Sequence, residues 1–286
     1  MIDLQILRQG LVFALGLDPA DAYVFHNLNY SYDNAGNVLS IQNNTVAPSS
    51  PDVGMQVGGP STQTFRYDDL YRLTHAEGSY QPRTPQTDRY RTDISYDSIH
   101  NVTNKTQVHE MVSNGNTIVE GKLSYNYGYS YASAKPHAAT TIGIYTVAYD
   151  ANGNLISRDQ QPMPRRQMIW DEENRLACSH ENVQSQTLPQ TPASCDNAGG
   201  TPNSARYFYD DQGNGVVKDG AQFHMYPNQN YSTRGNQQFK HVYIGATKLL
   251  TKFVEPVIRI EDRQYYVHTD HLGSTGFVTN DQGGHE

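Results

Sequence analysis

The sequence predicts an all-β protein, a strip of stacked antiparallel β-hairpins, and three observations carry this prediction. A pair made of an aromatic residue and aspartate recurs six times along the 286 residues. Turn-forming residues follow each pair, and an apolar residue stands two positions before it. Tyrosine is unusually frequent, with 21 copies against 8 Phe and 1 Trp, and it favours strands that keep one side in water.

The six copies align without gaps, but their spacing is irregular, which indicates an array of hairpins and not a solenoid of fixed period. Because alternate residues of a strand face the same side, each aromatic residue shares a face with the apolar residue two positions before it. The copies are YDNAGNVL from Tyr32, YDDLYRLT from Tyr67, YDSIHNVT from Tyr96, YDANGNLI from Tyr149, WDEENRLA from Trp170 and YDDQGNGV from Tyr209.

Each position after the aromatic residue has a mechanical role. The second position is always aspartate: Asp33, Asp68, Asp97, Asp150, Asp171 and Asp210. The fifth tends to accept positive φ, and it is Gly36, Tyr71, His100, Gly153, Asn174 or Gly213. The sixth is Asn37, Arg72, Asn101, Asn154, Arg175 or Asn214. A type I turn with a left-handed bulge would place the aspartate opposite the sixth position and the aromatic residue opposite the seventh. Each such cross-strand pair stabilises a hairpin by roughly 0.2–1 kcal/mol.

Ligand-binding interpretations of this motif are weaker. The Gly-Asn step lacks the glycine spacing of a dinucleotide or phosphate loop, and it lacks the alternating carboxylates of an EF-hand. A second polar cluster, HTDH, contains His268, Asp270 and His271. On a strand His268 and Asp270 share a face and His271 does not, so we expect a strand end followed by a turn and no metal site. We expect no catalytic residue and no cofactor.

Two cysteines, Cys178 and Cys195, flank a polar segment. A disulfide across a hairpin and a pair of free thiols both fit this spacing.

Three stretches rich in polar, Pro and Gly residues are expected to be loops, at 43–64, 81–93 and 179–204. The first 27 residues form a lead-in of uncertain structure, whose apolar run is too short for a membrane span.

Charge limits the partners. The formal net charge is −8, and the 21 Lys and Arg residues do not cluster. A protein that binds nucleic acid without sequence preference needs clustered positive charge. We therefore expect no nucleic-acid partner and no membrane span.

The repeat resembles the YD repeats of Rhs proteins, of the C subunits of insecticidal toxin complexes and of teneurins. The resemblance covers about residues 29–284. Its most specific part is the order of the later copies followed by HTDHLGST, which includes Gly273 and Ser274. The resemblance identifies this stretch (His268, Asp270, His271, Gly273 and Ser274) as the entry to an Rhs-associated core.

The resemblance implies a strip of hairpins that spirals into a hollow shell around a variable C-terminal toxin. Residues 28–286 would then be one YD-repeat domain, ending before the cleavage motif and the toxin, and so part of a shell. The expected partners are the rest of the shell, the enclosed toxin and subunits of a secretion system or toxin complex. The expected location is outside the cell or at its surface. An alternative function is an extracellular module that binds carbohydrate or a receptor through a Tyr-rich face.

Overall fold

A computed structural model describes residues 26–47, 58–160, 163–183, 190–196, 203–254, 264–270 and 272–280. His271 and most of the expected N-terminal lead-in lie outside these residues. Strands and turns make up nearly all of the described structure, and every pair of strands with an assigned register is antiparallel. The prediction of an all-β protein built from antiparallel hairpins is therefore confirmed.

The chain divides into two compact units. The first comprises the described residues up to Ser95 together with Lys105–Tyr125, and the second comprises Tyr96–Asn104 and the described residues from Asn126 onward. The predicted extent of a single domain, 28–286, stays a prediction.

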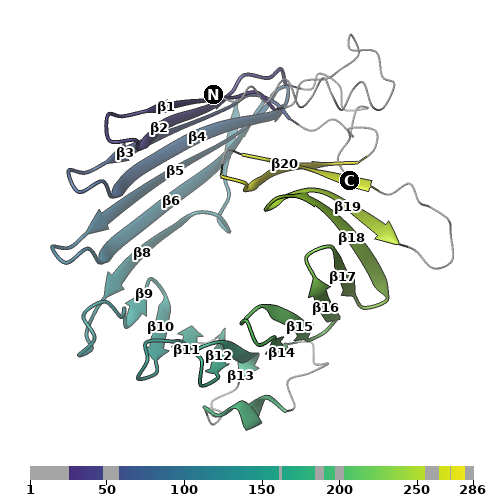
Figure 1. The fold of residues 1–286 in the computed structure, drawn as a ribbon. Coiled ribbons are helices and arrows are strands. Elements are labelled where there is room, and N and C mark those ends of the chain that lie inside the picture. The colour runs from purple at the N-terminus through teal and green to yellow at the C-terminus, as the bar shows by residue number, and fades with distance from the viewer. Residues whose placement is uncertain are drawn as a thin grey trace. The chain divides into compact units, whose positions relative to one another are not determined.

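The first unit contains a meander of five strands, each hydrogen-bonded to the next along the chain (Figure 1). These are β1 (Leu28–Tyr32), β2 (Val38–Asn43), β3 (Ser61–Tyr67), β4 (Leu73–Arg83) and β5 (Gln86–Tyr96). A further hairpin joins β6 (Val102–Ser113) to β7 (Asn116–Val119). Its two-residue turn is Asn114–Gly115, with φ of 50° and 78°, which is the geometry that an Asn-Gly step favours between strands.

The second unit continues the same pattern from β8 to β21, and again each strand pairs with the next one in the chain. The strands are β8 (Tyr125–Ser130), β9 (Thr141–Ile142), β10 (Tyr145–Tyr149), β11 (Leu155–Gln160), β12 (Met163–Trp170), β13 (Leu176–Val183), β14 (Ser204–Tyr209), β15 (Gly215–Asp219), β16 (Phe223–Asn228), β17 (Tyr231–Arg234), β18 (Gln237–Ile244), β19 (Thr247–Val254), β20 (Gln264–Thr269) and β21 (Thr275–Thr279).

The loops expected from polar composition are partly wrong. Residues 81–93 are not a loop, because they belong to β4 and β5, which pair from His75–Asp93 out to Arg83–Gln86. The expected loops at 43–64 and 179–204 also overlap the strands β3, β13 and β14. These strands carry polar residues that make cross-strand contacts, so their composition resembles that of a loop although they pair with neighbouring strands.

Buried apolar side chains are concentrated in the second unit. Ile169 on β12 and Cys178 on β13 are fully buried, and Cys195 of the short 3-10 helix η2 (Pro192–Cys195) packs against them. Elsewhere most strand residues are half-buried, as expected for a thin sheet with water on its faces. No helix among the described residues is long and apolar enough to cross a membrane.

Candidate functional site

The repeated feature of this molecule is a hairpin unit, the seven residues from each aromatic position to the aliphatic residue six positions later. In the unit that begins at Tyr32, the N–H of Asp33 donates to the carbonyl of Asn37 at 2.9 Å, and the N–H of Gly36 donates back to the carbonyl of Asp33 at 3.2 Å. The same two backbone bonds recur in the units that begin at Tyr67, Tyr96, Tyr149, Trp170 and Tyr209.

The aspartate side chain holds the turn together. In the first unit, Asp33 Oδ1 accepts from the N–H of Ala35 and the N–H of Asn37, at 2.9 and 2.8 Å. Its other oxygen, Oδ2, accepts from Asn37 Nδ2 at 2.7 Å. Where arginine replaces asparagine, its Nε takes the same place, 2.8 Å from Asp68 Oδ2 in one unit and from Asp171 Oδ2 in another. Each carboxylate therefore uses both oxygens on its own turn.

The fifth position of each unit adopts the left-handed backbone conformation. Gly36, Gly153 and Gly213 have φ of 89°, 95° and 83°. The three units without glycine have Tyr71, His100 and Asn174 there, with φ of 61°, 71° and 60°. Asparagine and histidine tolerate this region better than most residues, whereas a tyrosine there is strained. The aspartate bonds of that unit hold Tyr71 in this conformation.

The strand register in these units agrees with the sequence-based expectation. Tyr32 lies opposite Val38, Tyr67 opposite Leu73, Tyr149 opposite Leu155, Trp170 opposite Leu176 and Tyr209 opposite Gly215. In every one of these hairpins the register shifts at the aromatic residue. This is the bulge that a left-handed residue produces at the end of a three-residue loop.

A seventh hairpin unit begins at Thr269 and was missed in the sequence because threonine replaces the aromatic residue. The N–H of Asp270 donates to the carbonyl of Ser274, and Asp270 Oδ1 accepts from the N–H groups of Leu272 and Ser274. Gly273 has a φ of 85°, and Thr269 lies opposite Thr275. The spacing of Asp270, Gly273 and Ser274 matches the other units and is the signal that could have found it.

The described residues of HTDH therefore belong to a strand and a turn. His268 lies on β20, where its Nε2 is 2.9 Å from Thr279 Oγ1 on β21, and Asp270 holds the turn. His271 lies outside the described residues. Within the described part of the chain, no three His, Cys, Asp or Glu side chains cluster as a metal ion would require.

Successive hairpin units are joined by the polar end of the aromatic residue. Tyr67 Oη donates to the carbonyl of Val38, the seventh position of the preceding unit, at 3.0 Å. Trp170 Nε1 donates to the carbonyl of Leu155 at 2.9 Å, and Tyr209 Oη donates to the carbonyl of Leu176 at 3.0 Å. In these three units the aromatic side chain thus bridges one hairpin to the next.

Removing one of these donors should weaken the second unit. Tyr209→Phe is expected to lower the free energy of unfolding by about 1 kcal/mol, because it leaves the Leu176 carbonyl without its side-chain donor. Tyr207→Phe on the same strand is the matched control, since its hydroxyl makes no described hydrogen bond. Urea denaturation of both variants measures the difference, and equal stability would show that the Tyr209 contact contributes nothing.

Neighbouring turns also contact each other directly. Asn152 Nδ2 and Asn154 Nδ2 both donate to Asn174 Oδ1 at 2.8 Å, which joins the units that begin at Tyr149 and Trp170. Lys135 Nζ donates to the carbonyls of Asp150 and Ala151. These polar contacts hold the two neighbouring turns together.

In the six units that begin with an aromatic residue, the environment of the turn aspartate lowers its pKa below the usual 3.8. For Asp33, Asp68 and Asp210 the largest cause is the hydrogen bond from the side chain at the sixth position. For Asp97, Asp150 and Asp171 burial is the largest single contribution and raises the pKa, but the backbone and side-chain hydrogen bonds together outweigh it. The folded state therefore favours the charged form of all six.

Acid should therefore destabilise the protein through these turns. A carboxylate whose pKa is lower in the folded state stabilises the fold above its unfolded pKa, near 4, and this contribution is lost as the pH falls through the folded pKa. We expect the urea midpoint to drop between pH 5 and pH 3. Asp210→Asn removes one titrating group, so its midpoint should drop less over the same interval. An unchanged wild-type midpoint would contradict this expectation.

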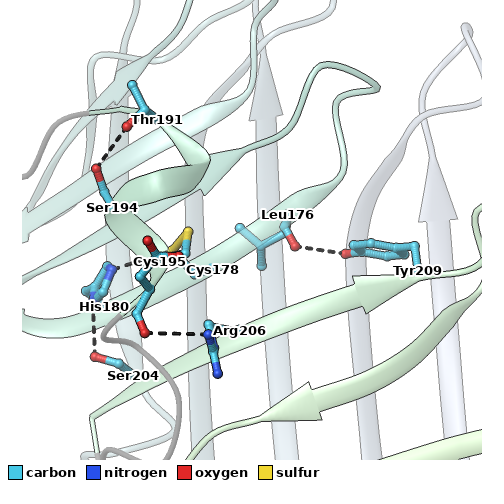
Figure 2. The surroundings of a disulfide bond; sticks show 10 residues. Leu176, Cys178, His180, Thr191, Ser194, Cys195, Ser204, Arg206 and Tyr209 are labelled. Atoms are coloured by element: carbon cyan, nitrogen blue, oxygen red, sulfur yellow. Dashed lines mark hydrogen bonds between the residues drawn. A yellow bond between two sulfur atoms is a disulfide. The ribbon is translucent and has the colours of Figure 1, made fainter.

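The two cysteines form a disulfide in the second unit (Figure 2). It joins β13 to η2 and lies in the buried cluster with Ile169. His180 lies beside it, with Nε2 3.5 Å from Cys178 Sγ and Nδ1 3.1 Å from Ser204 Oγ. Burial lowers the pKa of His180, so the folded state favours its neutral form. Because the disulfide links Cys178 of β13 to Cys195 of η2, it holds η2 against the sheet.

A serine–histidine contact in the second unit resembles part of a hydrolase site. Ser232 Oγ is 2.9 Å from His241 Nε2, and His241 Nδ1 is 2.9 Å from Thr251 Oγ1. In serine hydrolases a carboxylate orients the histidine and stabilises its charged form, whereas here a threonine hydroxyl occupies that place. The three side chains come from the adjacent strands β17, β18 and β19, so the contacts form a hydrogen-bonded ladder across the sheet.

Comparison with known proteins identifies the fold. No protein-family model matches the sequence, and no curated protein matches it. Part of a Tc toxin has the same fold. The chain is similar to a structure of the Photorhabdus luminescens Tc holotoxin pore that carries a mutation in TccC3, with a TM-score of 0.64, 17% sequence identity and coverage of 93% of this chain. Crystal structures of TcdB2–TccC3–Cdc42 and TcdB2–TccC3 give TM-scores of 0.49 and 0.47, each at 16% identity and with coverage of 93% of this chain. The chain spans about 13% of the length of each matched chain.

Proposed function

We propose that this chain is a wall segment of an Rhs-type YD-repeat shell and that the shell encloses a toxin. The observation that carries the proposal is the hairpin unit itself. Seven units in the part of the chain that the structure describes share one turn geometry, and their side chains hold turns and join neighbouring units. The similarity of the fold to part of a Tc holotoxin supports a role in a toxin complex.

The physical chemistry of the units suits a wall. A single hairpin is marginally stable in water, but a row of hairpins gains stability from each neighbour, as in other repeat proteins. The aromatic donors of Tyr67, Trp170 and Tyr209 supply such neighbour contacts. The proposed role requires no catalytic group, and we propose that the chain is not an enzyme. Its proposed partners are the rest of the shell, the enclosed toxin and toxin-complex subunits, and its proposed location is outside the producing cell or at its surface.

Electron microscopy of the complete gene product tests this function. We expect a hollow particle with density for the enclosed toxin, the passenger, inside it, and a solid particle without interior space would overturn the proposal.

Protease protection gives a second measurement. The passenger should resist protease in the wild type and in Glu172→Ala, and should be digested in the double variant Asp171→Ala, Asp210→Ala, whose broken turns open the wall.

A second candidate function is recognition of a carbohydrate or a receptor outside the cell. It is favoured by an exposed apolar group on one face of the second unit, in which Phe208 and Phe223 are 45% exposed and Met225 is 38% exposed. The register places Phe208, Val217 and Met225 in one row across β14, β15 and β16. A glycan array probed with the chain and with Phe208→Ala, Phe223→Ala distinguishes the two functions, because the shell function predicts no binding by either protein.

A further inference from the structure

Three basic residues stand in a row on neighbouring strands of the second unit. Lys218 on β15 lies directly opposite His224 on β16, and His224 lies directly opposite Arg234 on β17. Burial and the nearby charges of Arg234 and Lys218 lower the pKa of His224, so the folded state favours its neutral form. Lys218 and Arg234, on either side of it, carry the positive charge of the row. The chain as a whole is acidic, with a net charge of −8, so this row is unusual in its surroundings.

No carboxylate among the described residues pairs with this row. Arg234 Nε donates to Gln222 Oε1 at 2.7 Å, His224 Nδ1 is 3.2 Å from Tyr226 Oη, and Lys218 Nζ lies 6.0 Å from the centre of the Tyr207 ring. In contrast, the nearby Arg206 has a carboxylate partner in Asp219 at 2.7 Å. The positive charge of the row is therefore left for a group from outside.

The row lines a trough in the face of the sheet. Residues from β12 to β17 surround a hollow of about 670 Å³, among them Arg166, Glu181, Tyr207, Lys218, His224 and Arg234. Arg166 forms an ion pair with Glu181, so the uncompensated charge lies at the β15–β17 end. Six adjacent strands are about 24 Å across at the usual strand spacing. An extended peptide of about seven residues has this length.

We propose that this trough binds an extended acidic peptide segment of a partner protein. The length of the trough suits a peptide better than a small anion. Lys218 and Arg234 can each pair with a carboxylate of the peptide. A nucleic acid fits less well, since its continuous phosphate charge would meet an acidic protein with only two unpaired positive charges in the trough. The proposal does not depend on the shell function.

The chain contains a matched control for the experiment. Lys240 on β18 and Lys252 on β19 also lie directly opposite each other, but they do not line the trough. The variants Lys218→Gln, Arg234→Gln and Lys240→Gln, Lys252→Gln therefore remove the same charge from the two places. Because neither Lys218 nor Arg234 pairs with a carboxylate among the described residues, the thermal midpoint of the first variant should stay close to that of the wild type.

Fluorescence anisotropy with a labelled seven-residue glutamate peptide tests the proposal on the whole chain. We expect binding that weakens with salt and that falls about tenfold in Lys218→Gln, Arg234→Gln, as two lost ion pairs predict, with little change in the control. Binding that falls equally in both variants, or no binding to the wild type, would overturn the proposal. A labelled single-stranded oligonucleotide that bound more tightly than the peptide would assign the trough to nucleic acid and also overturn it.

Discussion

Removing the disulfide is expected to lower the free energy of unfolding of the second unit by about 3 kcal/mol. Cys178 and Cys195 are 17 positions apart in the sequence, and a cross-link of this span restricts the unfolded chain by about that amount. Both residues also belong to the buried cluster around Ile169, so the loss of packing adds to the effect. The double variant Cys178→Ala, Cys195→Ala avoids leaving a free thiol.

The chain contains a natural probe for this measurement. Its one tryptophan, Trp170, follows Ile169 on β12 and lies opposite Leu176 on β13. Urea denaturation followed by tryptophan fluorescence therefore reports on the part of the second unit that the disulfide secures. Reduction of the wild type should reproduce the effect of the double variant, and the same reductant should leave the double variant unchanged. A double variant as stable as the oxidised wild type would contradict the prediction.

The hairpin units could be predicted from the sequence because their structure is determined locally. An aspartate, a residue that accepts positive φ and an asparagine or arginine are all that the turn needs, and they lie within five consecutive positions. The contacts of Asp33 with Ala35 and Asn37 span no more than four positions. The unit at Thr269 keeps the aspartate and the glycine of this local rule, but it has threonine in place of the aromatic residue and Ser274 at the sixth position, and these two changes hid it.

Features that depend on distant residues could not be predicted in the same way. The composition of residues 81–93 resembles a loop, and their strand structure depends on pairing between β4 and β5. The spacing of Cys178 and Cys195 left two states open, because η2 and the fold of β13 decide whether the sulfurs meet. The bond from Trp170 to Leu155 requires two hairpins to lie side by side, and no single motif contains that information.

Breaking one turn should cost nearly as much as losing the disulfide. Asp171→Ala is expected to lower the free energy of unfolding by about 2 kcal/mol. Asp171 Oδ1 accepts from the N–H groups of Glu173 and Arg175, at 3.0 and 2.8 Å, and Oδ2 accepts from Arg175 Nε at 2.8 Å. The substitution removes both acceptor oxygens, and with them all three hydrogen bonds, at a side chain that is only 16% exposed. It also removes the bonds that hold Asn174 at a φ of 60°.

Two further variants separate the causes of this loss. Glu172→Ala removes a carboxylate from the adjacent turn position, which is exposed, so it should leave stability nearly unchanged and control for the loss of charge. Asp171→Asn keeps one oxygen for the two backbone N–H groups but cannot accept from Arg175 Nε, so it should retain about half of the stability that Asp171→Ala loses. Urea denaturation followed by circular dichroism measures all three variants. If Glu172→Ala lowered the free energy of unfolding as much as Asp171→Ala, the loss would come from the change in net charge. The hydrogen bonds of Asp171 would then not be what holds β12 and β13 in this register.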